Sequence, residues 1–318
     1  MITTDVEVAK QALIKNEVVA IPTETVYGLA ANAFNESAIK KIFSLKNRPF
    51  YNPLIVHIKS VDFLSRVACD IPDIAKNLAT EFWPGPLTLV LKKLPAIPDV
   101  VTAGKDTVGV RVPNHPLTLS LLQSLDFPLA APSANPFGSI SSTSALHVYN
   151  YFKNTLPVIL DGGECENGLE STIIGFENNQ PVLYRLGAIS IEDIEKVIGK
   201  IIVKTNASGT DVSAPGMLSR HYSPKTKTYL TDDVSACIKL FPTKKIGLLL
   251  FKDSLNVSNI IHEEVLSTSG NITEAAKDLY AALHRLDKLG LDMIIAERFP
   301  DNGIGKTIND RLQRAVAQ

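Results

Sequence analysis

The sequence predicts a mixed α/β protein of two domains, and three observations support this. The chain has 318 residues, more than one domain usually holds. Short apolar runs typical of strands alternate with amphipathic segments typical of helices. Residues 205–227 are rich in Ser, Thr, Gly and Pro and show no periodicity. They predict a linker between a domain of residues 1–204 and a second domain of residues 228–318.

The elements of the first domain follow from capping signals and periodicity. Thr4 and Glu7 have capping-box spacing, which predicts a helix over 6–15. Residues 18–23 predict a buried strand, 24–34 a loop, and 35–46 a helix, so that Lys46 and Arg48 fall where this helix ends. Further strands are predicted at 53–58, 87–93, 107–112, 128–134, 157–163, 171–176 and 181–186, and a helix capped by Ser190 at 191–200.

The second domain is predicted to contain a strand over 244–251, a long helix over 271–290, a strand over 291–299 and a final helix. Residues 300–307, PDNGIGKT, end like a phosphate-binding P-loop. Pro300 replaces the first glycine of that motif, and proline lacks the N–H that a phosphate cradle uses. This segment is therefore interpreted as a structural glycine turn.

Composition and charge exclude several classes of protein. The net charge of −1 argues against a broad polyanion-binding surface. The three cysteines have no paired spacing, and the six histidines are scattered, so no disulfide framework and no preformed metal site is predicted. The amino terminus lacks the apolar stretch of a signal peptide, and no apolar run approaches the roughly 18 residues that span a bilayer. These features predict a cytoplasmic protein without a membrane segment.

Polar residues gather at the ends of the predicted strands. In residues 107–112, Thr107, Gly109 and Arg111 alternate with three valines, so Arg111 stands beside a bare glycine floor that leaves space for a planar anion. His57 lies within another strand, and Ser133 and Asn135 end a third. Open α/β sheets bind ligands near such strand ends. Taken singly, Arg111 is better explained by a structural ion pair, and His57 by a hydrogen-bonded core histidine; only the combination of these residues favours a ligand site.

Several motifs occur in one order along nearly the whole chain: IPTETVYGL, KNRPFYNPLIVHI, WPGPLTLVL, TVGVRVPNHP, AAPSAN, DGG, ESTII and APGMLSRHYSP. In this order they resemble the threonylcarbamoyl-AMP synthase family, in its long form with a carboxy-terminal domain. The K-x-R of Lys46–Arg48 and the S-x-N of Ser133–Asn135 are specific in combination. The resemblance implies a YrdC-like twisted mixed open sheet with flanking helices, followed by a smaller Rossmann-like α/β domain.

The resemblance also implies a reaction and its residues. Threonine and bicarbonate form an N-carboxylate, which attacks the α-phosphate of ATP and releases pyrophosphate; a separate transferase then modifies tRNA beside the anticodon. Mg²⁺ is expected with ATP, and Lys46 and Arg48 are expected to serve catalysis by meeting the phosphates. The ATP residues implied are Arg48, Asn52, Thr107, Ser133, Asn135, Ser141, Arg185 and Tyr222. The threonine residues implied are Thr25, His57, Arg111, Ala131 and Ser171.

Two other functions remain open on the sequence. Related domains in hydrogenase-maturation proteins adenylate a carbamoyl group from carbamoyl phosphate, but they carry an acylphosphatase-like domain and zinc fingers that this chain lacks. A non-catalytic double-stranded RNA or tRNA-binding module is the alternative from another class, and a weak RNA contact is compatible with either.

The linker holds Met217, Leu218, Arg220, His221 and Tyr222, an apolar and cationic set that suggests a lid over the first domain. A passive spacer is the alternative.

Overall fold

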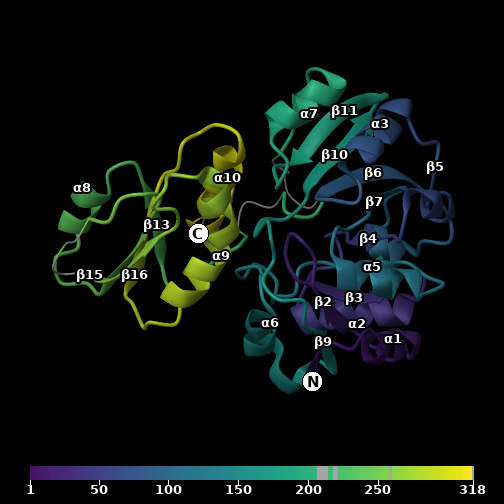
Figure 1. Cartoon of the computed structure of the whole chain (residues 1–318), viewed down its shortest axis with the longest axis horizontal. Coiled ribbons are helices and arrows are strands. Elements are labelled where there is room, and N and C mark those ends of the chain that lie inside the picture. Colours follow the sequence, from purple (N-terminus) through teal and green to yellow (C-terminus); the bar gives the residue numbers. More distant parts are fainter. Residues whose placement is uncertain (206–213, 218–220, 256, 258–259, 317–318) are drawn as a thin grey trace.

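The computed structural model describes residues 1–205, 214–217, 221–255, 257 and 260–316. Two sheets flanked by helices confirm the predicted mixed α/β fold class. Figure 1 shows the large sheet on the right and the smaller one on the left. The predicted domain boundaries fall between the last strand of the first sheet, which ends at Val203, and the first strand of the second, which starts at Thr228.

The first sheet mixes parallel and antiparallel pairs. In spatial order its strands are β1 (Ile2–Thr3), β9 (Val158–Leu160), β2 (Val19–Ile21), β3 (Gly28–Asn32), β8 (Leu129–Ala130), β4 (Ile55–His57), β7 (Thr107–Arg111), β6 (Leu87–Lys93), β10 (Thr172–Glu177), β11 (Gln180–Arg185) and β12 (Ile202–Val203), with β5 (Ala68–Cys69) paired to β6. Strands β4 and β7 are parallel neighbours, and His57 lies opposite Arg111 in their register. This pairing brings two of the sequence-predicted site residues to the same strand end.

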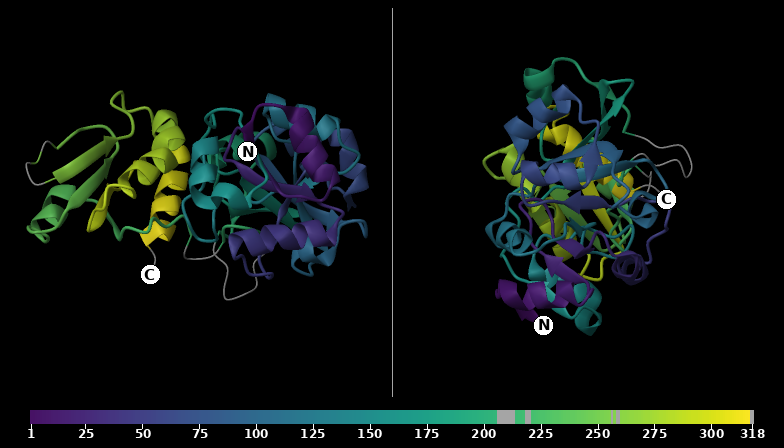
Figure 2. Two further views of the ribbon diagram at one scale, coloured as in Figure 1. Left: turned by 90° about the horizontal axis from the view of Figure 1, so that it is seen from below. Right: turned by 90° about the vertical axis from the view of Figure 1, so that its right-hand side faces the viewer.

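Helices cover the first sheet on both faces (Figures 1 and 2). They are α1 (Val6–Ile14), α2 (Glu36–Lys46), α3 (Asp73–Phe82), α4 (Asp99–Thr102), α5 (Pro116–Gln123), α6 (Ala145–Phe152) and α7 (Ile191–Ile198), with 3₁₀ turns η1 (Val61–Arg66) and η2 (Lys153–Thr155). Val108, Val110 and the next alternate residue, Val112, lie in the main core, as their spacing predicts. Helix α2 ends at Lys46 and is capped by Asn47, whose left-handed backbone (φ 50°) turns the chain so that Arg48 enters the loop before β4.

Two local predictions were wrong. The first helix is capped by Asp5, whose carboxylate accepts a hydrogen bond from the Glu7 N–H, and not by Thr4. Aspartate is at least as good a cap as threonine, and it stands one residue closer to the helix. The predicted loop 24–34 contains strand β3, which pairs with β2 and β8 on its two sides. Its Gly and Ala residues have weak strand propensity, so tertiary pairing decides the structure there.

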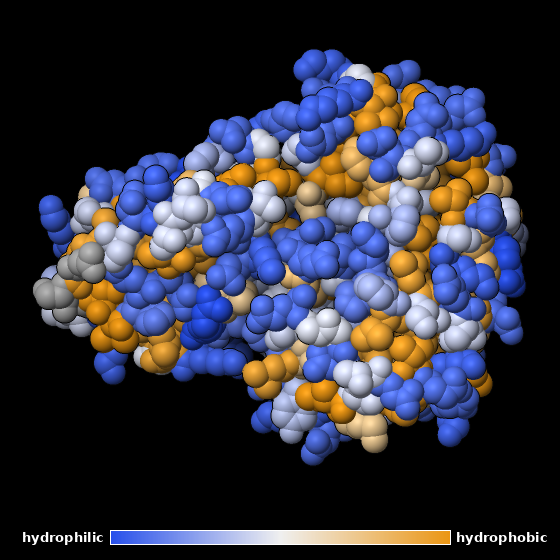
Figure 3. All heavy atoms as spheres, viewed as in Figure 1, coloured by the Kyte–Doolittle hydropathy of each residue, from blue (hydrophilic) through white to orange (hydrophobic). Residues whose placement is uncertain are grey.

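The second sheet is entirely parallel, as expected of a Rossmann-like domain. Its strand order is β13 (Thr228–Thr231), β16 (Met293–Glu297), β14 (Ile246–Leu250) and β15 (Ile260–Val265), with helices α8 (Val234–Lys239), α9 (Ile272–Leu286) and α10 (Ile304–Val316). Helices α9 and α10 lie between this sheet and the first domain, whereas α8 lies on the far side (Figure 1). On the face shown in Figure 3, hydrophilic residues predominate around the junction of the domains.

The P-loop-like segment contributes to this junction. Gly303 has φ 48°, which fits a structural turn. Lys306 Nζ lies 2.7 Å from Glu192 Oε1, and Thr307 Oγ1 donates to the Gly187 carbonyl at 3.0 Å. The lysine and threonine that would hold a phosphate in a P-loop thus contact the first domain, which agrees with the interpretation as a structural turn.

A pair of stacked histidines also lies at the junction and makes stability depend on pH. His284 of α9 stacks on His147 of α6 at 4.0 Å between ring centroids. Burial lowers the pKa of His147 to about 3 and that of His284 to about 4. Both pKa values lie below the value of about 6.5 that a histidine has in the unfolded chain. Between the folded and unfolded pKa values the unfolded chain therefore binds more protons than the folded protein, so the free energy of unfolding decreases as pH falls below about 6.5.

We expect the melting temperature to fall by a few degrees between pH 7 and pH 5, since each histidine contributes on the order of 1 kcal/mol there. His147→Phe keeps a ring in the stack but removes its protonation, so the fall should be smaller. His262→Gln, at an exposed histidine of β15, is the matched control. Its melting temperature should fall between pH 7 and pH 5 by as much as that of the unaltered protein. An equal fall in all three proteins would contradict this assignment.

Candidate functional site

A cavity lies where β4 and β7 end, and the linker forms part of its wall. The empty space within it measures about 590 Å³, a figure that includes space open to solvent. Its lining includes residues of strands β3, β4, β7 and β11 of the first sheet. The linker adds Pro215, Gly216, His221 and Tyr222. The strand-end location agrees with the general position of ligand sites in open α/β sheets.

Arg111 is held rigidly at the base of this cavity. Its Nη2 lies 2.6 Å from Glu24 Oε1, and both side chains are buried. Its Nη1 donates to Thr25 Oγ1 at 2.9 Å, and its Nε donates to the Gly85 carbonyl at 3.1 Å. Arg111 thus forms the structural ion pair that the sequence favoured for it alone, and it also lines the cavity, where its role toward a ligand stays a prediction. These contacts fix the plane of the guanidinium.

His57 stands next to Arg111 and is neutral at pH 7. Burial, and then the charge of Arg111, lower the pKa of His57 to about 3. Its Nδ1 is buried and has no hydrogen-bond partner among the described residues. A buried ring nitrogen without a partner is costly, so His57 offers a polar group that a ligand can satisfy.

The K-x-R residues play different structural parts. Lys46 Nζ donates to the carbonyls of Ser133 and Asn135 at 2.6 and 2.5 Å, so this lysine braces the S-x-N segment. Burial, and then the nearby charge of Arg48, hold the pKa of Lys46 well below its ordinary value. Arg48 donates to Asn52 O, Asn52 Oδ1 and Pro53 O at 3.1, 2.7 and 2.8 Å. Only Arg48 of the two lines the cavity.

The two residues of the S-x-N motif also differ in position, because Ser133 lines the cavity and Asn135 does not. Ser133 lines the cavity and forms a β-bridge with Gly28. Asn135 is fully buried, and its Nδ2 donates to the carbonyls of Pro136 and Ser139, both at 2.9 Å. Its amide thus shapes the loop that follows.

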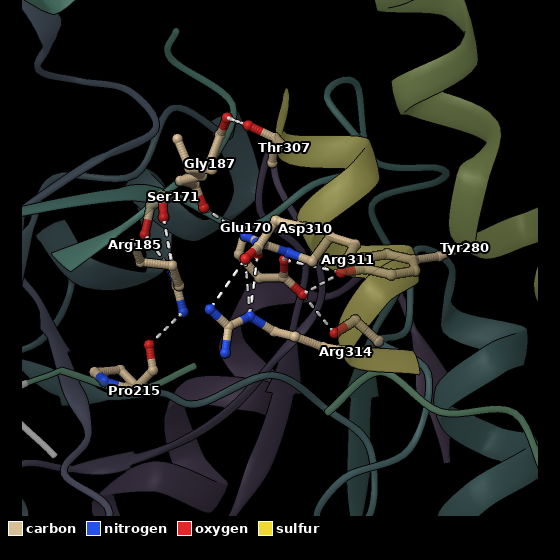
Figure 4. A network of polar contacts seen from close by, with 12 residues as sticks. Glu170, Ser171, Arg185, Gly187, Pro215, Tyr280, Thr307, Asp310, Arg311 and Arg314 are labelled. Carbon is tan, nitrogen blue, oxygen red and sulfur yellow. Dashed lines mark hydrogen bonds and ion pairs between the residues drawn. The ribbon is translucent and has the colours of Figure 1, made fainter. Parts of the chain in front are cut away.

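Arg185 connects the sheet with the linker. Its Nη2 donates to Ser171 O at 2.8 Å and to Ser171 Oγ at 3.1 Å, and its Nη1 donates to the Pro215 carbonyl at 3.2 Å (Figure 4). Thr88 Oγ1 lies 2.7 Å from Ser171 Oγ. Arg185 and Ser171 both line the cavity, so the linker is attached directly to the wall of the site.

Part of the linker borders the cavity, through Pro215, Gly216, His221 and Tyr222. Ala214 and Met217 pack in a small cluster with Ile55 and Ile173 of the first domain. Tyr222 is 1% exposed, and its hydroxyl has no hydrogen-bond partner among the described residues. Of the residues that suggested a lid, Met217, His221 and Tyr222 therefore lie against the first domain, as predicted. The other two, Leu218 and Arg220, and positions 206–213, lie outside the described residues.

The structure brings most sequence-predicted site residues together. Those lining the cavity are Thr25, Arg48, His57, Arg111, Ala131, Ser133, Ser171, Arg185 and Tyr222. Thr107 lies in a neighbouring cavity of about 300 Å³, which shares Pro53, Leu54 and Pro215 with the first. The structure places four others behind the lining of both cavities: Lys46, Asn52, Asn135 and Ser141.

Two buried glutamates were missed by the sequence analysis. Glu24 pairs with Arg111, and Glu170 lines the cavity and accepts a hydrogen bond from Ser141 at 2.6 Å. Both lie within motifs that were recognised, IPTETVYGL and ESTII. An acidic residue inside an apolar stretch is a signal of a buried, paired carboxylate, and that signal could have identified them.

The cavity wall is strongly cationic. Arg48, Arg111 and Arg185 converge on it from three segments far apart in the sequence. Burial, and then the charge of Arg185, lower the pKa of Arg48 to about 9, so it stays charged at pH 7. Fixed cations in a partly enclosed space stabilise anionic ligands and negative charge that develops in a reaction. The site is therefore suited to bring anions together.

The residues that the structure describes contain neither a cluster that could hold a metal ion nor a helix that could span a membrane. No three or more His, Cys, Asp or Glu side chains there are grouped so that they could hold a metal ion. None of the described helices combines the length and apolar character needed to cross a membrane.

Comparison with known proteins covers both domains. Residues 11–187 match the Sua5/YciO/YrdC family model described as "Telomere recombination", and residues 189–317 match the model "Threonylcarbamoyl-AMP synthase, C-terminal domain". The chain is 41% identical to the threonylcarbamoyl-AMP synthase of Pyrococcus abyssi, with 98% of this chain and 93% of that protein covered. It is 40% identical to that of Bacillus subtilis, with 99% and 94% covered.

Solved structures of P. abyssi Sua5 resemble nearly the whole chain. The crystal structure of P. abyssi Sua5 complexed with L-threonine superposes with a TM-score of 0.90 at 40% identity, covering 98% of this chain and 94% of that one. Because this agreement spans nearly the full length, it includes the second domain as well as the first.

Proposed function

The chain belongs to the threonylcarbamoyl-AMP synthase family, and from this premise we propose that its cavity joins L-threonine, bicarbonate and ATP into threonylcarbamoyl-AMP. Threonine's ammonium group first releases a proton, and the resulting amine takes up the carbon of bicarbonate with loss of one water and becomes an N-carboxylate. A carboxylate oxygen then attacks the α-phosphorus of ATP, and the bond to the β-phosphate oxygen breaks. Threonylcarbamoyl-AMP and pyrophosphate are formed.

The convergence of Arg48, Arg111 and Arg185 on one cavity carries this proposal. Threonine's carboxylate, bicarbonate and the triphosphate are all anions, and their mutual repulsion opposes the reaction. Buried cations held in place by other contacts offset that repulsion without reorganising. No covalent nucleophile is required of the protein.

We assign the two substrates to different parts of the site. Threonine is assigned to Thr25, His57, Arg111, Ala131 and Ser171, all of which line the first cavity. The P. abyssi relative, whose crystal structure holds L-threonine, supports this ligand. ATP is assigned to Arg48, Asn52, Thr107, Ser133, Asn135, Ser141, Arg185 and Tyr222. Since Thr107 lies in the adjoining cavity, the ATP set extends across both.

Three further elements belong to the proposal. Mg²⁺ accompanies ATP as a counter-charge to its phosphates. A separate transferase consumes the product and modifies tRNA. The protein works in the cytoplasm, which its unpaired Cys69, Cys165 and Cys237 favour.

The test is pyrophosphate release, measured with each substrate omitted in turn. We expect release only when threonine, bicarbonate, ATP and Mg²⁺ are all present. Release without threonine, or with carbamoyl phosphate as the only carbonyl donor, would contradict the proposal. A tRNA gel shift in the absence of any pyrophosphate release would favour the RNA-binding alternative.

A further inference from the structure

One acidic residue stands in the wall of this cationic cavity. Glu170 lines the cavity beside Ser171 and is only 5% exposed. A carboxylate at that position would oppose the binding of a polyphosphate. Its charge must therefore be balanced by neighbouring cations if the cavity is to hold a polyphosphate.

The second domain supplies most of this balance (Figure 4). Arg311 of α10 donates from Nε to Glu170 Oε2 at 2.9 Å. The Tyr280 hydroxyl of α9 lies 3.0 Å from each carboxylate oxygen. Burial alone would raise the pKa of Glu170, but the charges of Arg311 and Arg185 outweigh it, so the pKa lies below its ordinary value and the group is ionised. The ion pair thus joins the two domains directly behind the cavity.

The same two residues hold the linker tyrosine. The Arg311 guanidinium carbon lies 4.8 Å from the centre of the Tyr222 ring, and Tyr280 stacks on that ring with centroids 5.8 Å apart. Arg311 is itself fixed, because its Nη2 donates to the Leu186 carbonyl at 2.6 Å and its Nη1 pairs with Asp310 at 2.5 Å. Tyr222 therefore depends on the second domain for its place in the cavity.

We propose that Arg311 and Tyr280 are positioning residues of the ATP site: Arg311 neutralises Glu170 from behind, Tyr280 hydrogen-bonds to the same carboxylate, and both hold Tyr222 over the cavity. The inference rests on the proposed function, since it takes ATP as the polyphosphate. It gives the second domain a specific role: the cavity is fully cationic only when that domain is docked. By thermodynamic linkage, a bound polyphosphate in turn favours the docked arrangement.

The experiment measures ATP dissociation constants by calorimetry, together with melting temperatures, in the full-length chain. Arg311→Gln is expected to weaken ATP binding by about tenfold or more, because the charge of Glu170 is left uncompensated. Arg311→Gln combined with Glu170→Gln removes both charges and should restore affinity to within about threefold of the unaltered protein. A contact that only supports the fold would lower the melting temperature without this recovery of ATP affinity.

Two further variants complete the design. Tyr280→Phe changes no charge and little volume, so it should fold, and it is expected to weaken ATP binding by about threefold through the lost hydrogen bonds. Lys306→Gln removes a second inter-domain ion pair, which does not touch the cavity, and should leave ATP affinity unchanged. The inference is overturned if Arg311→Gln and Tyr280→Phe bind ATP as Lys306→Gln does. Absence of ATP binding in the unaltered protein would overturn the proposed function as well.

Discussion

Arg111→Ala is expected to raise the threonine concentration for half-maximal pyrophosphate release by about 10- to 150-fold, the range for losing a charge-assisted contact. The requirement for ATP should change much less. Removing the guanidinium also leaves Glu24 buried without its partner, which destabilises a fold by about 3–5 kcal/mol. A clear fall in the melting temperature should therefore accompany the loss of threonine use. Both quantities are measured on the same preparation.

Companion variants separate these two effects. Glu24→Gln with Arg111→Ala removes both charges, so it should recover stability but not threonine use. Arg111→Lys should rescue poorly, because lysine lacks the planar fork that reaches Glu24, Thr25 and a substrate carboxylate together. Arg298→Ala, at an exposed ion pair of the second domain, is the matched arginine control and should alter neither quantity. Unchanged threonine use in a folded Arg111→Ala protein would reduce Arg111 to a structural ion pair.

Arg48→Ala is expected to lower kcat/KM for ATP by about 100-fold, since a fixed cation that meets the phosphates is lost. The three acceptors it now satisfies on Asn52 and Pro53 would also lose their donor. Threonine affinity should change far less, because Arg111 and His57 remain in place. Steady-state kinetics with each substrate varied in turn distinguishes the two cases.

Lys46 should affect ATP use by a different route. Its Nζ braces the carbonyls of Ser133 and Asn135, so Lys46→Ala removes a support as well as a cation. We expect a loss in ATP use of about 10- to 100-fold together with lower stability. Lys92→Ala, at an exposed ion pair, provides the control and should change neither. If Arg48→Ala and Lys46→Ala impaired threonine and ATP use equally, the division of the site into two parts would be wrong.

The helices and strands were predictable where the spacing of hydrophobic residues in the sequence matches the face that is buried in the structure. The alternation of Val108 and Val110 with polar residues located β7, and the helical spacing before Lys46 located α2. Strand β3 escaped because its Gly and Ala residues carry no strand signal, and its structure depends on pairing with β2 and β8. The linker was predicted from composition, but composition alone does not place Tyr222 in the cavity.

The candidate site was predictable to the extent that its residues lie in local motifs. Arg48, His57 and Arg111 could be found in this way. The pairing of Glu170 with Arg311 joins residues 141 positions apart, and neither has a local pattern that indicates the other. Such contacts follow from the docking of two domains, which single-sequence periodicity does not describe.

The most direct test of the central claim follows the carbon of bicarbonate into the product. The protein is incubated with threonine, ATP, Mg²⁺ and isotope-labelled bicarbonate, and the nucleotide products are identified by mass spectrometry. Our account predicts threonylcarbamoyl-AMP that carries the labelled carbon, formed in equal amount to pyrophosphate and lost when threonine is omitted. Pyrophosphate released with an adenylate that contains no labelled carbon would contradict it.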